Sequence, residues 1–236
     1  MPPPRTALVT GATEGIGRAT AFALGRAGWQ VGVGARTASR LEALLGELAG
    51  AGIRAAGRAG DVGDERDAPA IVRHVADALG AVEALVNNAG VLIAKPFEEL
   101  TPADWDRTMA TNLRSLFLMT REVLPEMRRR RRGTVVNVAS LAGRNGFVGG
   151  TAYAASKHAV LGFSKSLMLE VRRDDIRVVA ICPGSVGTAM LRDQPLLKAD
   201  PDRILKPEDV ASTILHVLEL PERALVSELD IRPTNP

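Results

Sequence analysis

The sequence has little of what disulfide-bonded, metal-binding and membrane-spanning proteins need. The chain of 236 residues contains one cysteine, Cys182, so no internal disulfide can form. Its three histidines (His74, His158 and His216) are scattered and show no metal-ligand spacing. No apolar run reaches the roughly 18 residues that span a bilayer, and Met1–Arg5 has no signal-peptide apolar region. These absences favour a soluble, cytoplasmic protein without a metal site.

Aromatic residues and net charge are also scarce. Because aromatics make up only 3 % of the chain, Ala, Val, Leu and Gly must do most of the core packing, with Trp29, Trp105 and Cys182 as further packing residues. The near-balance of 30 basic and 27 acidic residues argues against a polyanion partner. The arginine run Arg128–Arg132 precedes Gly133, a natural helix C-cap, and cations there complement the helix dipole. We interpret the run as a solvated helix end rather than a nucleic-acid site.

Short, uniformly apolar runs alternate with amphipathic stretches of helical length, a pattern typical of parallel strands covered on both faces. The strands that we expect are Ala7–Val9, Gln30–Ala35, Leu85–Asn87, Thr134–Ala139, Arg177–Cys182 and, more weakly, Leu229–Ile231. The expected helices are Gly15–Ala27, Ser39–Ala51, Ala68–Leu79, Pro102–Arg130, Ala152–Arg173 and Pro207–Leu218. This alternation predicts an α/β fold with a doubly wound parallel sheet. The poorly patterned segment 189–206 is expected to be a loop or lid beyond a strand's carboxyl end, where ligands bind.

A glycine-rich turn directly follows the first predicted strand. Within Thr10–Gly17, Gly11 permits a tight turn, Gly15 lets the backbone approach a pyrophosphate, and Gly17 lets the helix pack closely on the strand. The helix N-terminus adds unpaired N–H groups and the positive end of its dipole. The spacing is GxxxGxG rather than the general GxGxxG, and glycines after a strand also occur as plain turn residues. The turn is therefore a candidate phosphate site that needs support from other motifs.

The second predicted strand ends beside a base instead of an acid. NAD sites usually carry an acid roughly 20 residues past the glycines, but no Asp or Glu occurs between Arg18 and Leu41. Arg36 follows the strand and Arg40 comes soon after; guanidinium groups match a 2′-phosphate. The pattern favours NADP(H) over NAD(H), the alternative being that Arg36 is a surface residue at a helix start.

Tyr153, the only tyrosine, lies four residues before Lys157 on a predicted helix, so both side chains share one face. A free phenol has a pKa near ~10 and a nearby cation lowers it, which makes the phenol a usable general acid or base. Ser140 follows a predicted strand and faces the same cleft, where its hydroxyl can bond a substrate oxygen. A YxxxK spacing alone occurs by chance in many helices.

Taken together, these motifs resemble the short-chain dehydrogenase/reductase family over essentially the whole chain. Thr10–Gly17 is similar to its TGxxxGIG cofactor turn, and Asn87–Gly90 to its NNAG motif. Asp61–Val62 resembles its adenine-contacting position, and Pro183–Thr188 its PGxVxT segment, whose threonine helps position the nicotinamide amide. The resemblance, with the arginines above, implies that the cofactor-binding residues are Gly11, Thr13, Glu14, Gly15, Ile16, Gly17, Arg36, Arg40, Asp61, Val62, Asn88, Ala89, Gly90, Tyr153, Lys157, Pro183, Gly184, Val186 and Thr188.

The resemblance also implies hydride transfer between NADP(H) and a carbonyl or alcohol. Ser140, Tyr153 and Lys157 match the family's serine, tyrosine and lysine in order and spacing, and Asn112 resembles its catalytic asparagine, which holds a water in a proton relay to the lysine. Ser140 would polarise the carbonyl while Tyr153 supplies the proton. Lys157 would bond the nicotinamide ribose and lower the pKa of Tyr153.

At the level of architecture, the resemblance implies one NAD(P)-binding Rossmann-like domain over residues 1–236, with about seven strands, and a homotetramer or dimer built on the helices that carry Asn112 and Tyr153. Glu14 departs from some NADP-preferring relatives, which carry a base there, and would repel a phosphate. Substrate cover is expected mainly from segment 189–206. Phe147, in the loop that lines the family's substrate site, is a candidate apolar wall.

The substrate itself stays open, because fold and cofactor motifs do not determine it. A 3-oxoacyl-thioester (acyl-carrier-protein) reductase is one alternative to a general carbonyl reductase, with Arg129 and Arg130 as candidates to dock an acidic carrier. A non-catalytic NADP(H)-binding sensor is more remote, because no member of the reactive set is missing. We expect a small-molecule substrate and neither a nucleic-acid nor a membrane partner.

Overall fold

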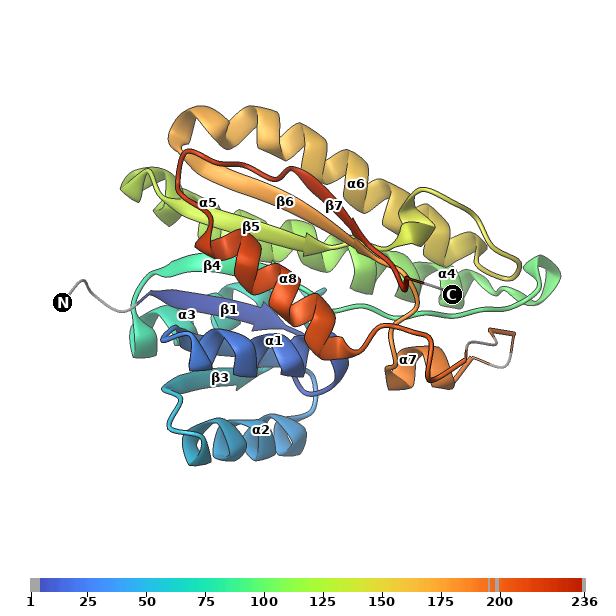
Figure 1. The fold of residues 1–236 in the computed structure, drawn as a ribbon, viewed down its shortest axis with the longest axis horizontal. Coiled ribbons are helices and arrows are strands. Elements are labelled where there is room, and N and C mark those ends of the chain that lie inside the picture. The colour runs from blue at the N-terminus through green and yellow to red at the C-terminus, as the bar shows by residue number, and fades with distance from the viewer. Residues whose placement is uncertain (1–4, 195, 198–199, 235–236) are drawn as a thin grey trace.

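Parallel strands form a single sheet in the computed structural model, which describes residues 5–194, 196–197 and 200–234. The order across the sheet is β3-β2-β1-β4-β5-β6-β7 (Figure 1). The expected doubly wound, Rossmann-like sheet of about seven strands is confirmed. The strand bounds are β1 (Thr6–Thr10), β2 (Gln30–Ala35), β3 (Ala55–Ala59), β4 (Val82–Asn87), β5 (Gly133–Val138), β6 (Ile176–Pro183) and β7 (Glu228–Ile231).

Among the strands that the structure describes, β3 is the one that the apolar pattern does not predict. Its sequence, AAGRA, contains no branched or aromatic residue, and its side chains are only partly buried because it lies at the edge of the sheet. A Cβ at Gly57 would lie 2.6 Å from Val33 Cγ2, so the site needs a residue without a side chain. Small residues fit here since an edge strand has less core to fill.

Helices cover both faces of the sheet. One face carries α1 (Gly15–Arg26), α2 (Ala38–Gly50) and α8 (Pro207–Glu219). The other carries α3 (Asp67–Leu79), α5 (Ser115–Arg130) and α6 (Thr151–Val171). Successive residues of β1 alternate between the two cores: Ala7 and Val9 pack against the first group and Leu8 against the second. The uniform apolar runs in the sequence follow from this double burial.

The predicted long helix Pro102–Arg130 is interrupted. It consists of α4 (Pro102–Met109), a π-helical turn over Ala110–Arg114, and α5. In the widened turn Asn112 is buried and hydrogen-bonds the backbone of Val91. Side-chain periodicity does not signal such a turn, because π-turns are short insertions that leave the apolar pattern on either side intact.

The end of α5 also differs from expectation. Arg131, not Gly133, takes the left-handed cap conformation (φ 50°). Gly133 instead begins β5, and a Cβ there would lie 2.5 Å from Met127 Sδ, so this glycine serves close packing. Trp105, expected to be a packing residue, is 39 % exposed, whereas Trp29 (5 %) and Cys182 (0 %) are buried as predicted.

Loops at the carboxyl ends of the strands gather the candidate site residues at one edge of the sheet. The expected lid begins there with the short α7 (Ala189–Arg192), while its residues 195, 198 and 199 lie outside the described part. So do residues 1–4 of the N-terminal segment considered above. In the described residues, no helix combines the length and apolar character needed to cross a bilayer.

Candidate active site

The glycine turn after β1 lies against two neighbouring loops. Gly11 (φ +64°) is so close to the loop after β4 that an added Cβ would sit 2.8 Å from Ala89 Cα. Gly15 (φ +53°) faces the loop after β6, where its Cβ would sit 3.0 Å from Thr188 Cγ2. Left-handed φ and close backbone approach both favour glycine at these positions. The turn is therefore a narrow backbone cradle at the start of α1.

Hydrogen bonds tie this turn to the end of β4. Thr10 Oγ1 accepts from the backbone N–H groups of Asn88 and Ala89, each at 3.0 Å. Asn88 Nδ2 in turn donates to the carbonyl oxygens of Thr10 and Gly11, at 3.0 and 3.1 Å. The sheet order reverses between β1 and β4, the switch point at which open α/β sheets bind ligands. These bonds hold the crevice at that point in one shape.

A cavity of about 180 Å³, the glycine cavity, opens from the cradle. Gly17 is not part of its lining; a Cβ there would lie 2.3 Å from the Gly11 carbonyl oxygen, so it serves helix packing as expected. The predicted cofactor residues that line this cavity are Gly11, Thr13, Glu14, Gly15, Ile16, Arg36, Arg40, Asp61, Val62, Asn88, Ala89, Gly90 and Thr188.

Charged side chains line the glycine cavity, among them Glu14, Arg36 and Arg40, and two of these three form an ion pair. Glu14 forms an exposed ion pair with Arg40, at 3.5 Å, so each partly neutralises the other. Arg36 forms no ion pair with any residue that the structure describes. Of the two arginines, Arg36 therefore has the charge left to hold a phosphate, and the pairing offsets the repulsion expected of Glu14.

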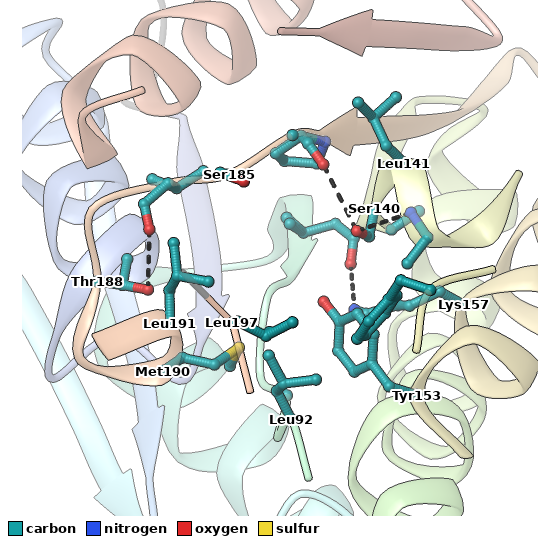
Figure 2. Close-up of a pocket in the computed structure, with 18 of the residues that line it drawn as sticks. Leu92, Ser140, Leu141, Tyr153, Lys157, Ser185, Thr188, Met190, Leu191 and Leu197 are labelled. Carbon is teal, nitrogen blue, oxygen red and sulfur yellow. Dashed lines mark hydrogen bonds between the residues drawn. The ribbon is translucent and has the colours of Figure 1, made fainter. Parts of the chain in front are cut away.

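A larger cavity of about 710 Å³, the Tyr153 cavity, adjoins the first (Figure 2). Ile16, Asn88, Gly90, Thr188 and Met190 line both cavities. Its other predicted site residues are Ser140, Tyr153, Lys157, Pro183, Gly184 and Val186. In Figure 2 Tyr153 and Lys157 lie on one side, with Thr188, Met190 and Leu191 across from them. The structure thus brings the predicted reactive and cofactor residues to one continuous space.

Tyr153 and Ser140 meet inside this cavity. Burial raises the pKa of Tyr153, and a hydrogen bond with Ser140 opposes part of that rise. Lys157, whose Nζ lies 5.7 Å from the centre of the Tyr153 ring, was expected to lower this pKa, but the loss of water around the phenolate dominates and the net shift is upward. Tyr153 is therefore held as a neutral phenol, the form that donates a proton.

Lys157 is buried beneath the phenol. It is 5 % exposed, and its Nζ donates to the Val138 carbonyl oxygen at 2.8 Å. Burial lowers the pKa of Lys157 to about 8, with a smaller opposing effect of Cys182. A lysine with such a pKa can gain or lose a proton near neutral pH. It can therefore both stabilise a phenolate and pass a proton onward.

Asn112 lies behind the cavity wall and lines neither cavity. Its Oδ1 accepts from Val91 N–H at 2.7 Å, and its Nδ2 donates to the Val91 carbonyl and to Ser156 Oγ, both at 3.0 Å. A Cβ at Gly90 would lie 3.3 Å from Asn112 Oδ1 and 3.8 Å from Lys157 Nζ. The asparagine therefore sits near the lysine, but its amide is occupied in fixing the loop after β4.

The loop after β4, the loop before α6 and the lid meet at the Tyr153 cavity. Phe147 lines it and meets the Tyr153 ring edge-on, with ring centres 6.2 Å apart, as expected for an apolar wall. From the lid, the Gln194 side-chain oxygen accepts from Ala94 N–H at 3.0 Å. Leu196 packs near Gly149, where an added Cβ would be 2.9 Å from Leu196 Cδ1. The lid is thus fastened to both loops opposite it.

Many residues of this wall carry no signal in the sequence. Scattered apolar side chains and the residues after β7 look ordinary until the fold brings them together. Chain order alone gave only the rough location of the lid. Met190, Leu191, Leu196 and Leu197 belong to the predicted lid segment; the lining residues that sequence reasoning missed are Leu92, Val138, Ala139, Leu141, Ala142, Asn145, Gly146, Ser185, Arg232 and Pro233.

Other candidate sites are weaker. The arginines at the end of α5 pair with acidic neighbours: Arg128 with Asp174, Arg131 with Asp175, and Arg130 with Glu83. They precede β5 and so lie at the amino edge of the sheet, opposite the cavities. Within the described part of the chain, no cluster of three or more His, Cys, Asp or Glu side chains is placed to hold a metal.

Comparison with known proteins gives a consistent result. A family model described as short chain dehydrogenase matches residues 5–196. The chain is 47 % identical over 188 residues to the ketoacyl reductase assigned to the monensin polyketide synthase of Streptomyces virginiae, spanning 79 % of this chain and 72 % of that protein. It is 34 % identical to a 3-oxoacyl-[acyl-carrier-protein] reductase of Thermotoga maritima, spanning 89 % of each.

Solved structures agree in fold. A variant of actinorhodin polyketide ketoreductase, crystallised with NADPH, superposes with a TM-score of 0.91 at 35 % identity, covering 98 % of this chain and 96 % of that one. A metagenomic short-chain oxidoreductase in complex with NADP gives a TM-score of 0.85 at 34 % identity, covering 98 % of both chains. The likeness therefore extends over nearly the whole described fold.

Proposed function

The chain belongs to the short-chain dehydrogenase/reductase family, and on this premise we propose that it reduces the 3-oxo group of an acyl thioester with NADPH as hydride donor. It is an NADP(H)-dependent oxidoreductase that acts on carbonyl or alcohol groups. The observation that carries the proposal is the Tyr153 cavity, which has a volume of about 710 Å³, is largely apolar, and is lined by Ser140 and Tyr153. Relatives named as ketoacyl reductases favour the 3-oxoacyl substrate over other carbonyls.

In the proposed reaction the chain's own groups manage the proton. Ser140 holds and polarises the substrate carbonyl, and Tyr153, kept neutral by burial, gives its proton to the carbonyl oxygen. The buried cation of Lys157 then stabilises the phenolate and, with a pKa of about 8, returns a proton to it. Asn112 positions the loop beside Lys157. When bound, the nicotinamide supplies the hydride.

The glycine cavity suits the nucleotide end of that cofactor. Its backbone cradle at the start of α1 offers N–H groups and a positive dipole to a pyrophosphate. Arg36 is proposed to pair with the 2′-phosphate, with Asp61 and Val62 at the adenine end. Thr188, which lines both cavities, is proposed to hold the nicotinamide amide at their junction.

A carrier protein is not proposed to dock on Arg129 and Arg130. Arg129 is paired with Glu126 and Arg130 with Glu83, and both lie at the edge of the sheet opposite the Tyr153 cavity. A carrier bound there would hold its acyl chain on the wrong side of the molecule. Replacing both arginines by alanine is expected to leave reduction of a carrier-bound substrate unchanged.

A substrate screen tests the proposed function. NADPH consumption is followed with 3-oxoacyl thioesters, simple ketones, aldehydes and quinones at equal concentration. The highest kcat/KM is expected for the 3-oxoacyl thioesters. Faster turnover of another carbonyl class overturns the substrate proposal, and tighter binding of NADH than NADPH overturns the role of Arg36.

We further propose one domain over residues 1–236, a homotetramer or dimer, and a cytoplasmic location. Large apolar side chains exposed on α4, α5 and α6 support self-association: Trp105 is 39 %, Phe117 46 % and Leu169 56 % exposed. Light scattering on the purified protein measures the assembly, and a monomeric mass contradicts this proposal. Cell fractionation measures the location.

A further inference from the structure

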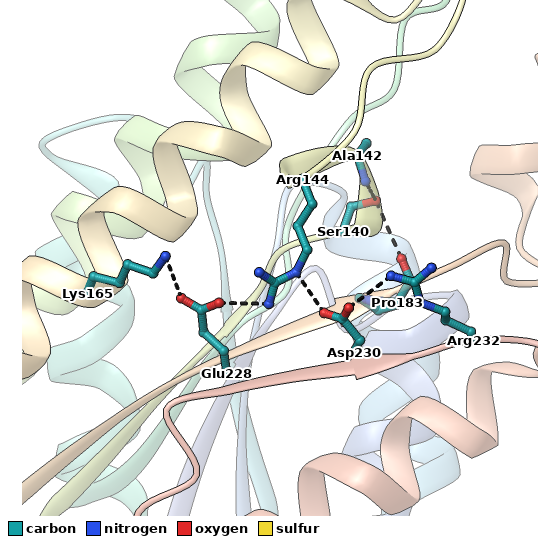
Figure 3. Close-up of polar contacts among 8 residues, drawn as sticks. All are labelled: Ser140, Ala142, Arg144, Lys165, Pro183, Glu228, Asp230 and Arg232. Atoms are coloured by element: carbon teal, nitrogen blue, oxygen red, sulfur yellow. Dashed lines mark hydrogen bonds and ion pairs between the residues drawn. The ribbon is translucent and has the colours of Figure 1, made fainter.

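A chain of ion pairs connects the last strand to the wall of the Tyr153 cavity (Figure 3). Arg144, just after the Ser140 turn, binds Glu228 at 2.7 Å and Asp230 at 2.9 Å, both on β7. Lys165 on α6 binds the other oxygen of Glu228 at 3.1 Å. Arg232, the second residue after Asp230, binds it at 3.0 Å. The strand edge is therefore fixed to the turn that carries Ser140.

The charges of this cluster do not cancel. Burial by itself raises the pKa values of Glu228 and Asp230, but the cations beside them reverse that effect and hold both pKa values below their usual range. Both carboxylates are thus ionised at neutral pH. Against them stand three cations, Arg144, Lys165 and Arg232, which leaves the cluster with one positive charge in excess.

Arg232 is the member of the cluster that lines the Tyr153 cavity. Its side chain is 55 % exposed, and its one ion pair within the described residues uses a single nitrogen, Nη2. The backbone around it is fixed: Gly184 N–H donates to the Ile231 carbonyl at 2.8 Å, and Pro233 packs against Gly184. Arg232 therefore keeps guanidinium N–H groups that no ion pair within the described residues uses, while the backbone that carries it is held in place.

The other residues that line the Tyr153 cavity carry little accessible charge. Among the described residues, no Asp or Glu lines the Tyr153 cavity, and its other cation, Lys157, is buried with its Nζ on the Val138 carbonyl. Most of the wall is apolar, as at Leu92, Leu141 and Leu197. Among the described residues, Arg232 is therefore the accessible charge in a largely apolar space.

We infer that Arg232 is a specificity-determining residue that binds an anionic group, a carboxylate or a phosphate, at the end of a substrate whose apolar part fills the Tyr153 cavity. This inference rests on the proposed function, since it assigns the substrate's second anchor in the same site. A charge-assisted hydrogen bond of this kind favours the anionic substrate about tenfold over a neutral counterpart.

Matched substrate pairs test the inference and distinguish the two anions. One pair is an aliphatic keto acid and its methyl ester; the other is acetoacetyl-coenzyme A and the neutral N-acetylcysteamine thioester of acetoacetate. Arg232→Ala is expected to lower kcat/KM about tenfold for the anionic member of a pair and less than about twofold for the neutral one. Loss confined to the first pair identifies a carboxylate, and loss confined to the second identifies a phosphate.

Controls separate charge recognition from folding. Arg232→Lys keeps the charge and is expected to retain most of the preference, whereas Arg223→Ala removes an exposed arginine outside both cavities and should change neither member. An equal fall for both members of both pairs, or an unchanged preference, overturns the inference.

A binding measurement keeps the inference independent of turnover. Calorimetry on the NADP⁺-loaded protein compares dodecanoate with dodecanol. Wild type is expected to bind the carboxylate about tenfold more tightly, and Arg232→Ala to bind both alike. Equal affinity in wild type for the two ligands, with no anionic preference in turnover, overturns the role of Arg232. Failure of wild type to reduce even the neutral substrates overturns the proposed function instead.

Discussion

The glycine cavity and the Tyr153 cavity share a wall but are built in different ways. The smaller, of about 180 Å³, is shaped by backbone: two glycines at positive φ and a threonine–asparagine clasp fix it at the switch point of the sheet. The larger, of about 710 Å³, is enclosed by side chains from separate loops. A backbone cradle tolerates little change and recognises a constant ligand, whereas a side-chain wall can be altered residue by residue.

This difference separates the two tasks of the enzyme. Substitutions of Tyr153-cavity residues that are not predicted to bind the cofactor, such as Leu92, Phe147 and Leu197, should change turnover and substrate choice while sparing cofactor affinity. Substitutions in the glycine cavity should do the reverse. Ile16, Asn88, Gly90, Thr188 and Met190, which line both, are the positions at which the separation must fail.

The largest expected effect comes from Tyr153→Phe, which removes the proton donor and keeps the ring that packs against Phe147. General acid catalysis contributes about 10²–10⁴-fold, so kcat should fall by about 10³-fold. The dissociation constant for NADPH should stay within about twofold of wild type, since the phenol oxygen is one contact among many. Stopped-flow turnover and fluorescence titration measure the two quantities. Appreciable activity in the variant removes Tyr153 from its role.

Lys157→Met tests how the buried ammonium group of Lys157 affects the stability of the fold. Because burial lowers the pKa of Lys157 from 10.5 to about 8, the unfolded state binds more protons between these values. The lysine's contribution to folding stability therefore rises as pH increases through that window. At pH values below this window, keeping Lys157 protonated in its buried site lowers the free energy of unfolding by up to about 3 kcal/mol. The variant should therefore be more stable than wild type there, although inactive.

Urea denaturation at neutral pH and near pH 10 measures this difference. The advantage of the variant should shrink at the higher pH. Lys165→Met, which alters an exposed lysine on the same helix, is the matched control and should show no comparable gain at neutral pH. A pH-independent difference between Lys157→Met and wild type contradicts the assignment.

Arg36→Ala tests the glycine cavity. It removes the cation of the glycine cavity that is not paired with a carboxylate of the described chain. The dissociation constant for NADPH should rise by about 10- to 30-fold and that for NADH by less than about twofold, the scale of a charged hydrogen-bond pair. kcat at saturating NADPH should change little. Arg40→Ala, whose arginine is shared with Glu14, should give a smaller shift.

The smallest effect is expected from Phe147→Ala. It widens the Tyr153 cavity at a side wall and removes the edge contact to the Tyr153 ring. KM should rise a few-fold for short acyl substrates and less for bulky ones, which can fill the added space, corresponding to about 1 kcal/mol of lost contact. NADPH affinity should be unchanged. A shift in NADPH affinity as large as that in KM would show that the two cavities are coupled.

Sequence patterns predicted most of the fold because doubly covered parallel strands are apolar throughout. Strand Gln30–Ala35 was predicted with the bounds that the structure shows. The failures have physical causes. Edge strand β3 is made of small residues, the π-turn over Ala110–Arg114 leaves no periodic trace, and Gly133 is needed for packing rather than for capping.

The residues of the two cavities also differ in how well they could be predicted from the sequence. The glycine cavity could be predicted because its backbone geometry is encoded locally, in Thr10–Gly17 and at Arg36. In the Tyr153 cavity, Tyr153 and Lys157 were predictable because they share one helix. Arg232 was not, since its role depends on where β7 joins the sheet, far along the chain. Nor was the raised pKa of Tyr153, which depends on the burial of its side chain in the folded protein.

The course of the chain beyond β7 bears on how the protein should be handled. The segment runs past Arg232 and Pro233 along the cavity wall, whereas β1 starts at the opposite edge of the sheet (Figure 1). An affinity tag joined after Thr234 therefore begins within a few residues of the cavity wall, where its histidines or acids compete with ligands for the guanidinium. A tag placed before Arg5 begins on the far side. Kinetic constants from the two fusions should be compared before either is used.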